Sequence, residues 1–130
     1  MAEMSNYLEN ALLNATLNNT TYTSPATTYL ALFTSDPTDA GTGTEVSGGN
    51  YARQALSFDT ASGTTGLVAT DAAVEFPQAT ANWGTVGWIG IYDASTAGNL
   101  MYHTALDVSK AIDTGDIFKI STGSLTVALA

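Results

Sequence analysis

The single histidine, His103, is the first residue to test for chemistry. Catalytic triads and similar sites need such a base held against a nucleophilic side chain. His103 lies in the sequence LMYHTAL, no serine stands in a nucleophile-elbow sequence, and cysteine is absent. A lone histidine in a strand is far more often a packing or surface residue than a general base. We therefore predict no catalytic residue, and an enzyme is the least favoured class.

Acidic residues are plentiful, and two pairs of them are closely spaced: Asp36 with Asp39, and Asp113 with Asp116. Both pairs lie in sequences typical of turns, where an aspartate usually accepts a hydrogen bond from its own backbone. A calcium site or a glycosidase pair stays open, but the EF-hand spacing is absent and nothing gathers six or more oxygens at one point. We predict no metal site and no cofactor.

The stretch GTEVSGGNYARQALSF, residues 43–58, carries the only arginine, Arg53. Its glycines match neither the P-loop nor the dinucleotide-binding pattern. Gly48 and Gly49 are expected to allow a turn that other residues adopt poorly, leading into a strand. Arg53 is expected to donate charge-assisted hydrogen bonds to a carboxylate, either in the same chain or in a neighbour. The stretch is interpreted as an assembly loop.

Four aromatic residues raise the possibility of a sugar-stacking platform: Tyr51, Trp83, Trp88 and Tyr92. Trp88, within VGWIGIY, is expected to pack in a core or between subunits. Trp83 follows a polar loop and is the better candidate for exposure, so a glycan-binding function depends on it. Packing is favoured over sugar binding.

The composition narrows the class of partner. The chain has 130 residues and a formal net charge of −9, with only three basic side chains. Such a chain repels polyanions, so nucleic acid and anionic membrane surfaces are excluded as partners. There is no cysteine, no basic and apolar leader, and no apolar run that spans a bilayer. We expect one domain, residues 1–130, made in a cytoplasm.

The pattern of apolar residues predicts one helix followed by strands. A helix is predicted over Met4–Asn18, because Met4, Leu8, Leu12 and Ala15 form a stripe at helical spacing. Ser5 is the expected cap, and the polar run 18–21 ends the helix. This apolar stripe must be covered by the sheet or by another subunit. Strands are predicted at Thr28–Thr34, Tyr51–Phe58, Leu67–Ala69, Ala72–Phe76, Thr85–Tyr92, Leu100–Leu106, Ile117–Ser121 and Leu125–Leu129.

These elements predict an all-β fold, an antiparallel sandwich or jelly-roll-like barrel with one N-terminal α-helix. Residues 1–20 hold the helix and residues 28–130 form the β body. TYLALFT is expected to be an interior strand because both of its faces are apolar. The acidic, glycine-rich segment Asp36–Asn50 exceeds the usual connection length, which predicts a surface feature or a mobile loop.

Three stretches carry a family resemblance: YLALFTSDPTDAGTGTEVSGGNYARQALSF, WGTVGWIGIYDASTAGNLMYHTAL and GDIFKISTGSLTVAL. They resemble the small virion proteins of tailed bacteriophages that are labelled tail-fibre-like, some of which are capsid decoration or cement proteins. The resemblance implies a β-rich structural protein without enzymatic activity.

The short, unrepeated chain favours capsid decoration over a long fibre. The expected role is to stabilise the shell by binding the major capsid protein on the outer capsid surface, after synthesis in the host bacterial cytoplasm. Analogy with cement proteins implies a homotrimer. A tail or tail-fibre component and a glycan-binding module are the alternatives. The expected assembly contacts are Met4, Leu8, Leu12, Asp36, Glu45, Tyr51, Arg53 and Trp83.

Overall fold

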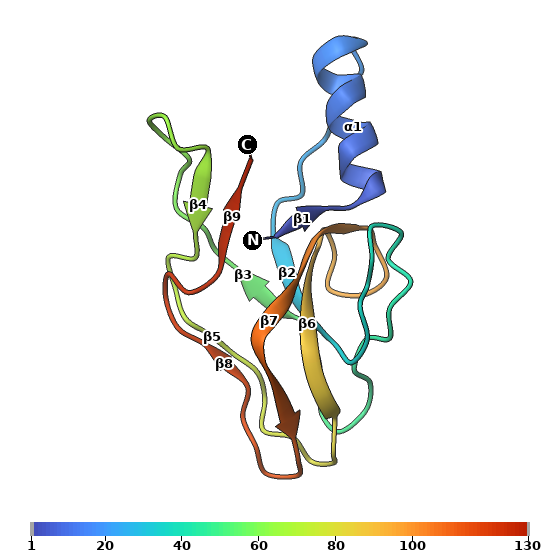
Figure 1. The fold of residues 1–130 in the computed structure, drawn as a ribbon, viewed down its shortest axis with the longest axis vertical. Helices are drawn as coiled ribbons and strands as arrows, with labels where there is room; N and C mark the ends of the chain where they lie inside the picture. Colours follow the sequence, from blue (N-terminus) through green and yellow to red (C-terminus); the bar gives the residue numbers. More distant parts are fainter. Residues whose placement is uncertain (1, 130) are drawn as a thin grey trace.

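The computed structural model describes residues 2–129, so the ends of the predicted domain, residues 1 and 130, lie outside the described residues. These residues form short and long antiparallel strands and one helix (Figure 1). The elements are, in chain order, β1 (Glu3–Met4), α1 (Asn6–Leu17), β2 (Thr28–Phe33), β3 (Gln54–Leu56), β4 (Leu67–Ala69), β5 (Val74–Glu75), β6 (Gly84–Tyr92), β7 (Leu100–Ile112), β8 (Lys119–Ile120) and β9 (Thr126–Ala128).

The main sheet has five strands in the order β1-β7-β6-β2-β3, all antiparallel to their neighbours. β2 lies inside this sheet, as its sequence predicted. Its last four residues, 30–33, are all buried because side chains on both faces of the sheet are covered. The all-β prediction with a single N-terminal helix is confirmed.

A second layer packs on one face of the main sheet. It consists of two short antiparallel ladders, β4 with β9 and β5 with β8, which lie beside β3 and β7 in Figure 1. The core between the layers joins side chains from both of them, including Leu30, Leu32, Val86, Ile89, Phe76, Phe118 and Leu125. A smaller cluster lies on the opposite face of the sheet, formed by Ala31, Phe33, Tyr92 and Leu100. The two clusters explain why β2 and β6 carry apolar residues on both faces.

β7 is much longer than its neighbours and carries a wide irregularity. Val86 pairs with Lys110, but Trp88 pairs with Ala105, so residues 106–109 of β7 lie opposite the single residue Gly87. Bulges of this kind bend a strand and interrupt its pairing. β7 bends visibly along its length in Figure 1.

The helix is shorter at its start than predicted. Met4 belongs to β1, where it pairs with Tyr102, so the prediction that the helix begins at Met4 is wrong. The backbone N–H of Ser5 donates to the Met101 carbonyl at 2.9 Å, which holds this segment extended along β7. Ser5 is the N-cap, as predicted, and its hydroxyl accepts from the N–H of Leu8. α1 is too short to cross a membrane, and no other segment of residues 2–129 forms a membrane-spanning helix.

Several predicted strands have different limits in the structure. The predicted strand over 51–58 is restricted to Gln54–Leu56, and those at Ala72–Phe76 and Ile117–Ser121 each shorten to two residues. β7 instead extends past Leu106 to Ile112. Beyond the short β5–β8 ladder the same two chains remain hydrogen-bonded, since the N–H of Phe76 donates to the Phe118 carbonyl and the N–H of Ala79 donates to the Asp116 carbonyl, but the pairing is irregular there.

Candidate assembly surface

Arg53 is held entirely within its own chain. Its Nε and one terminal nitrogen donate to the two carboxylate oxygens of Glu45, at 2.9 and 2.8 Å. The other terminal nitrogen donates to the carbonyls of Ala94 and Ala97, at 3.0 and 2.8 Å. The guanidinium also lies 3.6 Å from the centre of the Tyr92 ring. Arg53 therefore joins three separate segments, and its carboxylate partner is in the same chain.

Tyr51 extends this cluster into the sheet. Its hydroxyl donates to Glu45 at 2.6 Å and accepts from the backbone N–H of Leu32 at 3.0 Å. Burial, together with the hydrogen bond to Glu45, raises the pKa of Tyr51 far above its ordinary range. Burial alone would lower the pKa of Arg53, but the hydrogen bond and charge of Glu45 outweigh it and raise that pKa. The Tyr51 hydroxyl and the Arg53 guanidinium therefore both keep their protons across the ordinary pH range.

The acidic segment 36–50 is folded back on β2. The N–H of Thr34 donates to Thr44 and the N–H of Val46 donates to Leu32, each at 2.9 Å. Gly48 and Gly49 have φ of +74° and +57°, so the predicted glycine turn is confirmed. A Cβ on Gly49 would lie 2.8 Å from the Trp83 indole nitrogen. Residues 36–50, which we call the strap, are therefore held along the edge of the sheet by backbone hydrogen bonds to β2.

The expectation that Trp83 is exposed is wrong. Its side chain is only 5% accessible, and its indole N–H donates to the Gly49 carbonyl at 2.9 Å. It packs edge-on against Tyr51 and Phe76, with ring centres 5.4 and 6.3 Å away. The polar residues before it misled the prediction, because they form a turn whose next residue points into the core. Trp88 is partly buried against the smaller cluster, as its sequence predicted.

Arg53, Tyr51, Glu45 and Trp83 were predicted as assembly contacts, but the structure uses them inside the chain. The Arg53 side chain is 8% accessible and that of Glu45 is 25% accessible. Asp36 stays exposed, and its carboxylate accepts from the N–H of Thr38 at 2.9 Å, which is the local turn bond its sequence predicted. Asp116 likewise accepts from the N–H of Asp113.

α1 is the predicted contact element that remains on the surface. It rises from one end of the body in Figure 1 and lies against β7 near its start. Leu8 is buried, and Leu12 and Met4 are half-buried. Leu13 and Leu17 are 54% and 75% exposed, although four-residue spacing places them on one side of the helix. The sheet thus covers only part of the apolar surface of this helix.

His103 meets two carboxylates that are distant in sequence. Its Nε2 lies 2.8 Å from a carboxylate oxygen of Asp39, and its side chain is 7% accessible. Glu3 pairs opposite His103 across β1 and β7, and ligand atoms of Glu3, Asp39 and His103 lie within 4.8 Å of one another. One imidazole and two carboxylates are a donor set that suits a divalent cation such as Zn²⁺ or Mn²⁺. Sequence reasoning missed this cluster, because three separate segments contribute to it.

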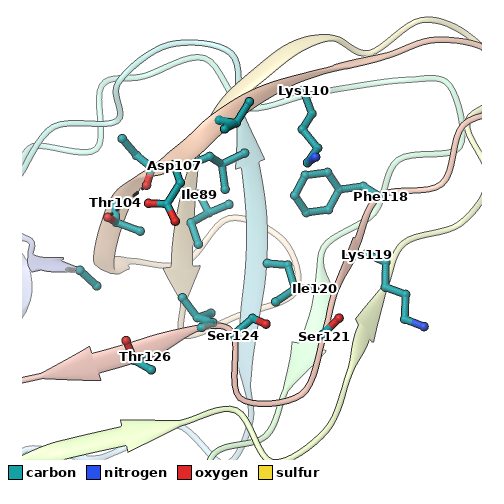
Figure 2. A pocket seen from close by; sticks show the side chains of 15 residues that line it. Ile89, Thr104, Asp107, Lys110, Phe118, Lys119, Ile120, Ser121, Ser124 and Thr126 are labelled. Atoms are coloured by element: carbon teal, nitrogen blue, oxygen red, sulfur yellow. Dashed lines mark hydrogen bonds between the residues drawn. The ribbon is translucent and has the colours of Figure 1, made fainter.

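A groove separates β7 from the chain that runs through β8 to β9 (Figure 2). Its volume is about 520 Å³, and Ile89, Leu106 and Phe118 contribute apolar side chains to it. Both lysines of the protein, Lys110 and Lys119, line this groove. In Figure 2, Lys110 points from β7 toward Phe118, and Lys119 points outward at the rim. The sequence did not reveal the groove, because its two walls are separate in the chain.

Comparison with protein families gives a match over nearly the whole chain. A family model described as "Podophage GP4 fiber I protein gp80" matches residues 3–128, which is nearly the whole chain. A search of curated proteins finds no match. The match agrees with the resemblance to small tailed-phage virion proteins and with the β-rich fold. The chain therefore belongs to the podophage GP4 fiber I protein gp80 family and is a fibre-related component of a phage virion.

Proposed function

We propose that this chain is a non-enzymatic structural subunit of a virion fibre and that α1 joins it to copies of itself as a homotrimer. The family name supports the fibre, and the exposed apolar surface of α1 is the observation that supports self-assembly. A structural fibre subunit needs no catalytic base. This agrees with the burial of His103, the only histidine in the sequence, against Asp39.

The helix carries the argument for self-assembly. A helix of 12 residues is marginal in water by its own propensity and depends on packing for its stability. α1 buries only Leu8 fully in its own chain and exposes Leu13 and Leu17. Its charge is low, since Glu9 is the only ionisable carboxylate and no basic residue is present in it. Helices from several copies can therefore approach along the leucine side with little repulsion.

Sedimentation of the purified full chain tests the trimer. We expect a homotrimer for the natural chain and a monomer for Leu13→Ser combined with Leu17→Ser, because that variant removes the shared apolar contact. The matched control is Leu67→Ser combined with Leu129→Ser, since these leucines are 40% and 49% exposed outside α1. The control is expected to remain trimeric. A monomeric natural chain, or equal dissociation of both variants, contradicts the proposal.

Capsid decoration is the second candidate, with the major capsid protein as partner and the outer capsid surface as location. The specific observation in its favour is that the sequence of residues 1–130 contains no internal repeat, whereas fibre shafts are usually repetitive. Electron microscopy of virions labelled with an antibody against this chain separates the two roles. Label on fibres supports the first proposal, label spread over the shell supports decoration, and unlabelled virions contradict both.

The glycan-binding alternative depended on an exposed Trp83 side chain. Trp83 is buried and its indole N–H is already bonded to Gly49, so it offers no stacking surface. We also propose that the chain binds neither nucleic acid nor anionic membranes. With 12 acidic side chains and only three basic ones, the protein repels negatively charged surfaces. Neither the fibre role nor the decoration role requires a cofactor.

A further inference from the structure

The groove lies between β7 and the segment through β8 and β9, and within residues 2–129 no ladder joins residues 105–110 of β7 to β8 or β9 across it. β1 is the only strand of residues 2–129 that pairs with the outer edge of β7, and its ladder joins Glu3 to His103 and Met4 to Tyr102. Residues 106–109 also have no register partner on β6. On the opposite wall, β8 pairs only with β5 and β9 only with β4. An unpaired strand edge presents N–H and C=O groups that can accept another strand.

We propose that this groove receives an extended, acidic segment of another protein chain, which adds a strand to the exposed edge of β7. The added strand would lie between the main sheet and the second layer, where its apolar side chains would meet Leu106, Phe118 and Ile120. Val108, at the middle of the bulge, is 69% exposed and would be covered at the rim. This inference holds for a fibre and for a shell protein alike.

Charge identifies the chemistry of the segment. Lys110 and Lys119 both line the groove, whereas the protein as a whole has a net charge of −9. The two ion pairs within residues 2–129 use Arg53 and His103, so neither lysine forms a salt bridge there, although Glu75 on β5 is the register partner of Lys119. Asp107 is the one acidic residue in the wall. Two cations at the rim therefore favour carboxylates at alternate positions of the incoming strand.

A second copy of the chain is a poorer occupant. The irregular stretches at residues 20–26 and 59–66 are mostly exposed and hold one acidic residue between them, Asp59, so neither offers carboxylates at alternate positions. A small anion would use the lysines but would leave the strand edges unpaired. The volume of about 520 Å³ is compatible both with a small ligand and with part of a peptide. The strand edges favour the peptide, because a peptide can form backbone hydrogen bonds with them.

Peptide titration of the isotope-labelled full chain, followed by nuclear magnetic resonance, tests the proposal. The probes are synthetic strands of about eight residues, one alternating Val with Glu and one alternating Val with Lys. We expect the Val/Glu strand to shift the amide signals of residues 105–110 and 118–126, and to bind more weakly as salt is raised. The Val/Lys strand is expected to leave these signals in place.

Two variants separate charge from a general loss of structure. Lys110→Gln with Lys119→Gln should weaken binding of the Val/Glu strand by about tenfold, the size expected for two exposed ion pairs. Ser62→Asp with Thr64→Asp is the matched control, because these exposed residues lie outside the groove. Both variants change the net charge by −2, from −9 to −11. The control should bind like the natural chain.

A third probe tests strand addition itself. The same Val/Glu strand with alternate N-methylated residues cannot donate the backbone hydrogen bonds and should not bind. Equal binding of the methylated strand, equal binding of Val/Lys, or signal changes away from the groove would overturn the proposal. The proposal would also be overturned if the double lysine variant bound the Val/Glu strand normally but aggregated. In that case the two lysines would serve only to keep the edge of β7 from pairing with other chains. Self-association through the groove that the lysine variant abolishes would instead assign the groove to a second copy.

Discussion

The Arg53 side chain connects segments of the fold that are far apart in sequence. Its guanidinium donates to Glu45, eight residues earlier, and to carbonyls more than forty residues later. A lysine could not repeat this pattern, because its ammonium lacks the planar fork that grips a carboxylate in two places. Arg53, predicted as an assembly contact, thus makes these hydrogen bonds within its own chain.

Replacing Arg53 should therefore destabilise the chain itself. We expect Arg53→Ala to lower the free energy of unfolding by about 3 kcal/mol, because Glu45 and two carbonyls lose their donors in a poorly hydrated place. Urea denaturation measures the change. Lys110→Ala is the control, since Lys110 is exposed and has no ion pair in residues 2–129, and it should change stability by under about 0.5 kcal/mol. An Arg53→Ala chain of natural stability would show that the network is dispensable.

Ser5 is where two elements meet. Its hydroxyl donates to the Leu100 carbonyl at 2.5 Å and accepts from the N–H of Leu8, and its backbone N–H bonds to Met101. One residue thus ends β1, begins α1 and ties both to β7. This arrangement explains why the helix keeps a defined direction although little of it is buried.

Removing that hydroxyl should loosen α1 more than the body. We expect Ser5→Ala to lower the free energy of unfolding by about 1 to 2 kcal/mol, which is the range for a lost N-cap. Amide hydrogen exchange should accelerate within α1 and remain unchanged in β2 and β6. Ser47→Ala, at an exposed serine of the strap, serves as the control. Uniform acceleration across the chain would mean that Ser5 supports the whole fold rather than the helix.

At the scale of the whole molecule, folding raises the pKa of four tyrosines. Burial is the largest cause in each case and raises the pKa of Tyr22, Tyr51, Tyr92 and Tyr102. In the unfolded chain these phenols ionise near their ordinary pKa of 10.0. The native chain therefore keeps protons that the unfolded chain releases at high pH.

This difference predicts an alkaline limit to stability. The contribution is present in full below about pH 10 and is lost as the pH rises through the raised pKa values of the native chain. Thermal unfolding between neutral pH and pH 11 should show a midpoint that declines only at the alkaline end. Tyr51→Phe should lower the midpoint at neutral pH but reduce its alkaline slope, since its phenol no longer titrates. An unchanged slope in that variant would assign the decline to other groups.

The sequence by itself determined the local features of this protein. Alternating apolar residues predicted the β class, the continuous apolar run at 28–34 predicted an interior strand, and Ser5 and the paired glycines marked a cap and a turn. Each of these signals depends on residues within a few positions of one another. The resemblance carried by three stretches indicated the virion class, which the family match confirms.

Tertiary structure alone decided which distant segments meet. It placed Trp83 in the core, gave Arg53 its carbonyl partners, and brought Glu3 and Asp39 to His103. It also set β7 opposite the β8–β9 segment and left a groove with both lysines between them. The physical reason is that periodicity shows which face of a strand is buried but not which strand lies beside it. That choice depends on loop closure and on packing across the whole core.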